Sequence, residues 1–108
     1  MDEQKVLNLL HMARKAGKVQ MGFDACERCC SGGIAKLLIA AEDLAEKKKI
    51  KLKELADAYN VKFLVFGLKS RYGQEFKIRD LGVICVEDIN FSKGIVKCVS
   101  PLSDTRKS

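Results

Sequence analysis

The chain has 108 residues, five cysteines and a net charge of +6, which arises from 20 Lys and Arg against 14 Asp and Glu. This length suits one domain, and 47% hydrophobic with 31% charged residues is the balance of a folded soluble protein, which excludes a disordered chain. No window approaches the roughly 20 apolar residues of a membrane helix, and the start, MDEQKV, is unlike a signal peptide, so we expect a cytoplasmic protein without membrane contact.

The first predicted element is a helix over residues 4–16. Its apolar residues recur at three- and four-residue steps, as a helix with one buried face requires: Val6, Leu7, Leu10 and Ala13. Gly17 is expected to end this helix. His11, the only histidine, lies within it with no carboxylate or cysteine at a ligand spacing, so we interpret it as structural.

A strand, a helix and a second strand are predicted for the stretch KVQMGFDACERCCSGGIAKLLIAAED. Gly22 separates the extended run VQM from a helix over residues 24–30, and two glycines end that helix before the apolar run 37–41. A helix that begins at a strand end presents unpaired backbone N–H groups and the positive end of its dipole, which suit phosphate. This edge is therefore the candidate binding edge.

A longer helix is expected over residues 44–59, with Asp43 as its N-cap. Its inward residues are predicted to be Leu44, Ile50, Leu52, Leu55 and Ala56. Five lysines spread around the same helix, so we interpret them as a solvated face: Lys47, Lys48, Lys49, Lys51 and Lys53. Glu42 and Asp43 could form an acid pair at the strand end, but a helix cap is the commoner role.

Two more strands and two more helices complete the pattern. Residues 61–67, VKFLVFG, are an apolar run predicted to be a strand buried on both faces. A short helix capped by Ser70 follows, and residues 79–82 are expected to be a loop. After the strand GVICVE, Asp88 is predicted to cap a final helix over residues 90–99.

Strands that alternate with helices predict an α/β sandwich around a mixed or parallel sheet. We expect one domain over residues 1–100, followed by a flexible tail over residues 101–108. Such folds host many functions, and the motifs that would indicate catalysis are absent from the sequence. There is no Gly-rich phosphate loop, no serine elbow and no second histidine to partner a nucleophile, so we do not expect an enzyme.

Three cysteines, Cys26, Cys29 and Cys30, lie three and four residues apart and therefore project from one face of the short helix. Zinc sites usually pair two such clusters, whereas Cys85 and Cys98 stand singly. We interpret the thiols as small hydrophobes packed against the sheet, with metal binding or redox sensing as the alternative. No disulfide, metal or cofactor is expected.

Five short motifs occur in a fixed order: Gly17-Lys18-Val19, Gly22, Ala35-Lys36-Leu37, Ala41-Glu42-Asp43 and Tyr59-Asn60-Val61. In this order and spacing the chain resembles, over about residues 6–99, the ribosomal-protein superfamily that binds kink-turn RNA. The resemblance extends to its archaeal large-subunit member and to small bacterial relatives of the YlxQ and YbxF type. It implies a three-layer α-β-α sandwich around a four-stranded mixed sheet, and RNA binding without catalysis.

In the kink-turn binders of this superfamily, the helix after the glycine carries the motif G-x-N-E-x-x-K, whose polar side chains reach guanine edges. Gly22 and Phe23 stand at the first two positions, and Arg28 keeps the cation at the last, where it could donate to guanine O6 and N7. Asp24 replaces the asparagine and Ala25 the glutamate. A bidentate base contact is worth roughly 1–3 kcal/mol of discrimination, so the resemblance implies weakened or altered kink-turn specificity.

The resemblance also implies RNA contacts outside that motif. Lys18 and Lys36 would bind phosphates, which need only charge and position. In the superfamily, the loop before the last strand packs against a flipped-out nucleotide. Ile78 and Leu81 could serve here, with Arg79 reaching a phosphate.

Three hypotheses about function follow. The first, favoured by the charge of +6 and by the resemblance, is a monomer that binds structured RNA, such as ribosomal RNA or a kink-turn, in ribosome assembly or translation. The second is a thiol module for metal or redox chemistry. The third is a protein-interaction adaptor that kept the fold and lost RNA binding. Salt-sensitive RNA binding, reactive thiols or a partner that survives nuclease treatment would distinguish them.

Overall fold

Four strands form the sheet at the centre of the computed structural model, which describes residues 3–79 and 81–99 of the chain. They are β1 (Val19–Met21), β2 (Leu37–Ala40), β3 (Lys62–Val65) and β4 (Val83–Val86), in the spatial order β1-β4-β2-β3. β4 pairs antiparallel with β1 and β2, whereas β2 and β3 are parallel. The sheet is therefore mixed, and β1 and β3 are its edge strands.

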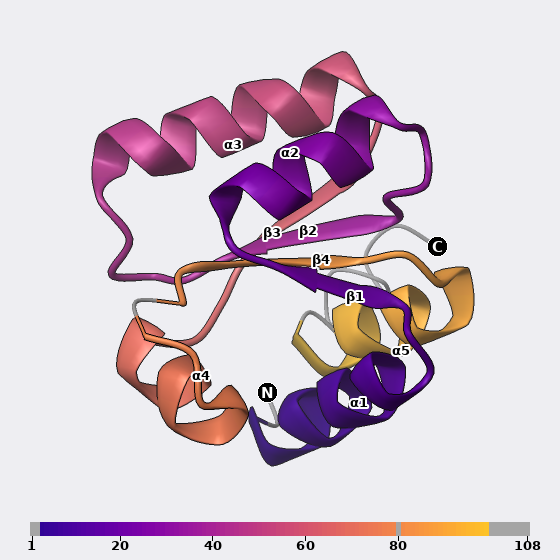
Figure 1. Cartoon of the computed structure of the whole chain (residues 1–108), viewed down its shortest axis with the longest axis vertical. Coiled ribbons are helices and arrows are strands. Elements are labelled where there is room, and N and C mark those ends of the chain that lie inside the picture. Colours follow the sequence, from indigo (N-terminus) through magenta and orange to yellow (C-terminus); the bar gives the residue numbers. More distant parts are fainter. Residues whose placement is uncertain (1–2, 80, 100–108) are drawn as a thin grey trace.

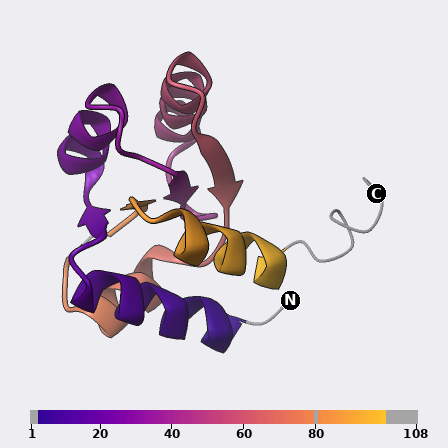
Figure 2. The same ribbon diagram turned by 90° about the vertical axis from the view of Figure 1, so that its right-hand side faces the viewer.

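Two layers of helices cover the two faces of this sheet (Figure 1 and Figure 2). α2 (Phe23–Ser31) and α3 (Glu46–Ala58) lie on one face, and α1 (Glu3–Lys15), α4 (Lys69–Phe76) and α5 (Ile89–Val99) lie on the other. Successive side chains of a strand point to opposite faces, so β2 contributes to both halves of the core. The three-layer α-β-α sandwich around a four-stranded mixed sheet, expected from the sequence, is confirmed.

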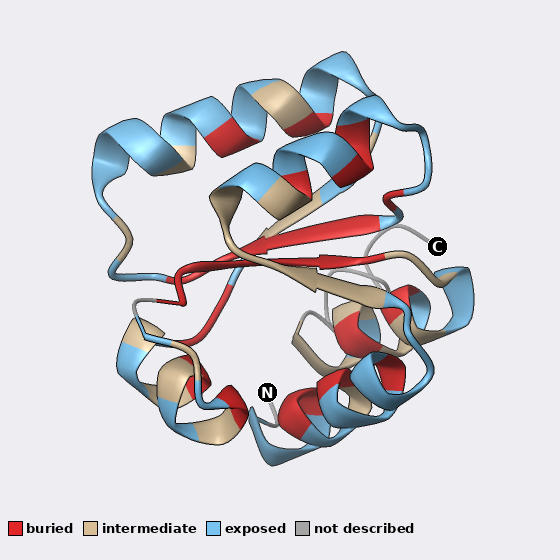
Figure 3. Ribbon diagram, in the orientation of Figure 1, coloured by how far each residue is buried: buried red, intermediate tan, exposed pale blue. Residues whose placement is uncertain are grey.

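Helices with the predicted spacing of apolar residues direct those side chains toward the sheet, as the buried residues in Figure 3 show. In α1 the four residues with helical spacing are all fully buried: Val6, Leu7, Leu10 and Ala13. The thiol face of α2, formed by Cys26, Cys29 and Cys30, is buried against Leu38 and Cys85 of the sheet. Periodicity alone therefore located the buried faces of these two helices.

Asp43 caps a different helix from the predicted one. α3 begins at Glu46 and has no side-chain cap, whereas Oδ1 of Asp43 accepts a hydrogen bond of 2.9 Å from the backbone N–H of Lys69 at the start of α4. The prediction that Ser70 caps this short helix is also wrong, because Ser70 lies inside α4. β2 and β3 are parallel neighbours, so the loops that follow them meet, and the cap crosses from one loop to the other.

β3 is more exposed than its apolar sequence predicts. Burial on both faces requires a central position, but β3 pairs only with β2 and lies at the edge of the sheet, where Val65 is 42% exposed. In the neighbouring helix α3, the predicted inward residues Leu52 and Ala56 are buried, whereas Ile50 is 56% exposed. Local apolar runs therefore overestimated burial on this side of the molecule.

The final helix is capped as predicted. Oδ2 of Asp88 accepts a hydrogen bond of 2.9 Å from the N–H of Phe91 in the first turn of α5. The predicted tail over residues 101–108 lies outside the described residues. Within residues 3–79 and 81–99, no helix has the length and apolar character that crossing a membrane requires.

Candidate nucleic-acid interface

Several loops meet at one end of the strands, where β1, β2 and β3 end and β4 begins (Figure 1). We call this end of the sheet the loop edge, as distinct from the edge strands. β1 and β2 are both antiparallel to β4 and therefore run in the same direction. The N–H of Gly22 donates to the carbonyl of Val83 over 3.1 Å, and the N–H of Ala41 to that of Gly82 over 2.8 Å. The first bond joins the start of α2 to the first residue of β4, and the second joins the end of β2 to the loop before β4.

At the opposite end of the strands stand Lys18 before β1, Lys36 before β2 and Lys62 at the start of β3. We call this end of the sheet the lysine edge. Backbone bonds of 2.8 Å fix this edge, from Lys36 N–H to the Val86 carbonyl and from Glu87 N–H to the Lys18 carbonyl. Strands of three or four residues rise about 3.3 Å per residue, so the two edges lie roughly 13 Å apart. The predicted phosphate contacts Lys18 and Lys36 therefore do not lie with Gly22.

The helix α2 carries the motif residues from the loop edge down one face. Gly22 precedes it with φ +97°, a conformation that favours glycine, and Phe23 packs half-buried against the core between α2, α3 and the sheet. Asp24 and Arg28 are exposed and four residues apart, so they lie one turn apart on the same helix face. A ligand held at the start of α2 would meet Asp24 first and reach Arg28 one turn further on.

A cleft of about 360 Å³ opens beside α4 at the loop edge. Among the residues that the structure describes, three cations line it, Lys69, Lys77 and Arg79, together with Ile78 and the carboxylate of Asp43. The Asp43 carboxylate accepts the backbone N–H of Lys69. Within the described part of the chain, the cations of the cleft thus outnumber its carboxylates by three to one, which suits phosphate oxygens.

The three predicted residues of the loop before β4 have different positions. Ile78 and Arg79, both expected from the resemblance to contact RNA, line the cleft. Leu81 is only 1% exposed and packs in the core with Tyr72 and Phe76, so it supports the loop from within and cannot face a nucleotide. Of the two apolar side chains in this loop, Ile78 is therefore the one that lines the cleft.

Sequence reasoning did not identify Lys69 and Lys77 as part of this cleft. They stand at the two ends of α4, and Lys77 ends that helix in the left-handed conformation, with φ +59°. Neither position shows a motif in the sequence. The only usable signal was that two lysines flank a helix of eight residues that leads into the loop.

The carboxylates after β2 serve the backbone. Oε2 of Glu42 accepts the N–H of Gly67 over 3.2 Å, while the N–H of Glu42 donates to the Gly67 carbonyl over 2.7 Å. The Asp43 carboxylate accepts the backbone N–H of Lys69, so both acidic side chains join the end of β2 to the segment after β3. Asp43 is therefore a helix cap, but of α4 and not of the predicted helix, and Glu42 binds the backbone of Gly67, which lies before α4.

The thiols of α2 are packed away from solvent. Cys26, Cys29 and Cys30 are buried, and the Cys29 sulfur lies 3.0 Å from that of Cys85. Burial raises the pKa of Cys29 to about 11 and also raises those of the other three thiols. The thiolates that metal or disulfide chemistry needs are therefore disfavoured at neutral pH. In residues 3–79 and 81–99, no group of three His, Cys, Asp or Glu side chains is arranged to hold a metal ion.

The single histidine joins two helices. Nε2 of His11 lies 2.8 Å from Oε1 of Glu75, and its ring lies against Phe76 with centroids 4.6 Å apart. The hydrogen bond from His11 lowers the pKa of the Glu75 carboxyl. These contacts tie α1 to α4 and agree with a structural role.

Comparison with known proteins supports the fold. No family model matches the chain. The chain is similar to a solved structure described as a protein with unknown function from Bacillus halodurans, with a TM-score of 0.83 and 26% sequence identity. The match covers 91% of this chain and 99% of that one. The α/β sandwich thus has a solved counterpart along nearly its whole length.

Proposed function

We propose that this protein is a non-catalytic RNA-binding protein of the cytoplasm that uses the loop edge to bind structured, kink-turn-like RNA in ribosome assembly or translation. The observation that carries the proposal is the cleft at this edge, where Lys69, Lys77 and Arg79 gather around Ile78. The sequence resemblance to kink-turn binders supports the same edge, because it points to Gly22 and to the loop before β4.

Each group in the cleft suits one part of a folded RNA. Lys69, Lys77 and Arg79 offer charge-assisted hydrogen bonds to phosphate oxygens, which hold the RNA without reading its sequence. Ile78 offers an apolar surface for a base that has left the stack, a common feature of structured RNA recognition. Arg28, on the exposed face of α2, is the group that can donate in bidentate fashion to a guanine edge.

Asp24 changes the expected specificity. Its carboxylate stands on the exposed face of α2, one turn above Arg28, where a kink-turn binder would place an amide donor. A carboxylate repels phosphate and accepts hydrogen bonds without donating them. We therefore expect binding to kink-turn RNA that depends more on the cations of the cleft than on base contacts.

A titration against two labelled RNAs tests this function. One is a kink-turn RNA, the other a straight duplex of the same length, each measured at two salt concentrations. Tighter binding to the kink-turn is expected, with an affinity that falls as salt rises by about 0.9 log units per log unit of salt for each phosphate contact. Equal affinity for both RNAs, or no binding, would contradict the proposal.

Variants of matched charge locate the binding edge. The double substitution Lys77→Ala with Arg79→Ala should lower the salt slope for kink-turn RNA by about 1.8, since two phosphate contacts are lost. Lys48→Ala with Lys51→Ala removes the same charge from the exposed side of α3 and should leave the slope unchanged. If the two double variants weaken binding equally, net charge rather than the cleft determines affinity.

A further inference from the structure

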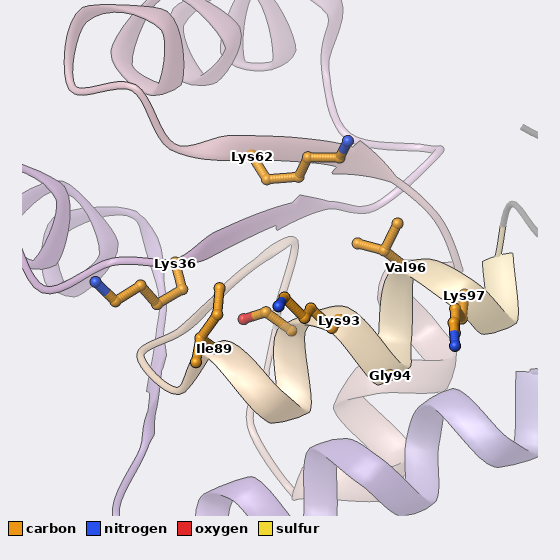
Figure 4. Close-up of a pocket in the computed structure, with 8 residues that line it drawn as sticks. Lys36, Lys62, Ile89, Lys93, Gly94, Val96 and Lys97 are labelled. Atoms are coloured by element: carbon orange, nitrogen blue, oxygen red, sulfur yellow. The ribbon is translucent and has the colours of Figure 1, made fainter. Parts of the chain in front are cut away.

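A second basic hollow lies at the lysine edge, between β3 and α5 (Figure 4). Its volume is about 560 Å³, and four lysines line it: Lys36, Lys62, Lys93 and Lys97. In Figure 4, Val96 rises from α5 toward Lys62 on the strand and Lys93 extends along α5 toward Ile89, while Lys36 and Lys97 stand at the rim with their amines turned outward. We call this hollow the lysine groove.

The fold leaves this groove open because of where α5 packs. α5 lies mainly against α1 and contacts β4, whereas β3 is the edge strand beyond β2. Within residues 3–79 and 81–99, no helix therefore covers the underside of β3 at Lys62. Apolar side chains form the walls, with Val96 half-buried on one side and Ile89 exposed on the other.

The charge of the groove is unbalanced. Among the residues that the structure describes, its lining includes no Asp or Glu, and none of its four lysines forms an ion pair within 4.0 Å. The nearby carboxylate of Asp88 caps α5, and that of Asp57 pairs with Lys53 over 2.8 Å. Four lysines without compensating carboxylates favour a ligand with several negative charges.

The groove continues around the edge of the sheet toward an aromatic ring. A neighbouring hollow of about 660 Å³ shares Lys36, Lys62 and Ile89 with the groove and reaches Tyr59, whose side chain is 49% exposed. Lysines beside an exposed aromatic ring form the usual surface for single-stranded nucleic acid, in which phosphates follow the cations and a base stacks on the ring.

We propose that the lysine groove binds a single-stranded segment of the RNA, with phosphates on Lys36, Lys62, Lys93 and Lys97 and a base stacked on Tyr59. A rigid duplex cannot place its backbone and a base inside a hollow of this size together, whereas the unstacked nucleotides of a single strand can. The inference rests on the proposed function in that the ligand is RNA. It adds a second binding surface, on the opposite edge of the sheet.

The test uses a labelled single-stranded RNA of about ten nucleotides, a length within the range that single-strand binding modules occupy. Lys93→Ala with Lys97→Ala should lower the salt slope by about 1.4 and weaken binding at 0.1 M salt by about 25-fold, since each contact with a single strand contributes about 0.7 to the slope. Lys48→Ala with Lys51→Ala, the control of equal charge, should bind as the unchanged protein does. A urea unfolding curve for each variant tests whether it is folded.

Tyr59 supplies an independent measurement. Tyr59→Ala should weaken binding of the single strand by about fivefold or more, because a stacked base is lost, and Tyr59→Phe should bind as the unchanged protein does. A third probe, a kink-turn RNA with a single-stranded extension, should bind more tightly than the same RNA without it. That gain should vanish in the Lys93 and Lys97 double variant.

The outcomes separate this inference from the proposed function. Binding of the single strand without preference for a kink-turn would support the groove while contradicting the function proposed for the loop edge. Preference for the kink-turn with no gain from the extension would overturn the groove. The groove proposal also fails if a glutamate-rich peptide binds there and single-stranded RNA does not, since the ligand would then be an acidic protein.

Discussion

Gly67 is a tightly packed residue of the loop edge. Its φ is +81°, and a Cβ added to it would lie 2.6 Å from the hydroxyl oxygen of Tyr72. That hydroxyl is buried and donates to the Phe66 carbonyl over 2.6 Å, so the ring cannot move aside without losing a hydrogen bond. The glycine, the tyrosine and the end of β3 therefore form one rigid unit.

Gly67→Ala should lower the free energy of unfolding by about 3 kcal/mol or more, because a strained φ adds to a steric clash with a buried ring. Gly33→Ala is the matched control, since Gly33 has φ +79° but nothing within 4 Å of an added Cβ. It should cost only about 1–2 kcal/mol. Urea unfolding measures both, and equal losses would show that the contact with Tyr72 is relaxed at no cost.

Asp88 makes a simpler contribution at the start of α5. Asp88→Ala removes the acceptor for the Phe91 N–H and should lower the free energy of unfolding by about 0.5–2 kcal/mol. Asp88→Asn keeps an acceptor oxygen and should recover most of that loss. The comparison is made by urea unfolding at neutral pH, and a loss as large for asparagine as for alanine would contradict a capping role.

The two capping aspartates show where prediction from the local sequence succeeds and where it fails. Asp88 bonds a residue three positions away, so the sequence around it contains all the information that the prediction needs. Asp43 bonds Lys69, 26 positions away, and that contact exists only because β2 and β3 are neighbours in the sheet. Strand order is not part of any local pattern, and the prediction for Asp43 was wrong for that reason.

At the scale of the elements, the same limit explains the candidate site. The resemblance pointed to Gly22 and to the loop before β4, which lie at one edge of the sheet, and Ile78 and Arg79 line the cleft there. Lys18 and Lys36 follow the same motifs in sequence, but they stand at the other ends of their strands. Distance along a strand, which a list of motifs ignores, separates them from the cleft.

The packing of α2 gives a prediction about thiol chemistry. In the folded protein at pH 7, Cys26, Cys29, Cys30 and Cys85 should not react with an aromatic disulfide reagent within minutes, because burial blocks access and raises their pKa. Cys98 is partly exposed and should react first. Addition of denaturant should release four further thiols, counted by absorbance.

Rapid modification of more than one thiol in the native protein would favour the hypothesis of a thiol module. Cys98→Ser provides the control, since it removes the one partly exposed sulfur among the described residues. In that variant the native protein should show almost no reaction. Mass spectrometry after partial labelling identifies which cysteine reacts.

For the molecule as a whole, the core and the two edges of the sheet differ in the side chains that they contain. The helical layers bury the apolar faces, and the ends of the strands remain free for charged side chains. Cations therefore gather at both edges, in the cleft beside α4 and in the lysine groove beside α5. An RNA that contacts both edges must extend along the sheet, so its folded and single-stranded parts must be adjacent.

The core between the sheet, α2 and α3 also links stability to pH. It contains four buried thiols, and burial raises the pKa of Cys29 from 9.0 to about 11. Below pH 9 these thiols are protonated in the folded and in the unfolded chain, so they have no effect on the pH dependence of stability. Above pH 9 the unfolded chain loses their protons while the folded chain keeps them, and the equilibrium shifts toward unfolding.

The free energy of unfolding should therefore fall as pH rises from 9 toward 11, by at most about 1.4 kcal/mol per pH unit for each thiol that stays protonated in the folded state. Urea unfolding at pH 8, 9 and 10 measures this decline. Cys29→Ala removes one titrating group, and its curve should fall less steeply by about that amount per unit, although the variant is less stable at pH 8. Parallel curves for the variant and the unchanged protein would mean that the Cys29 thiol ionises as readily in the folded core as in water.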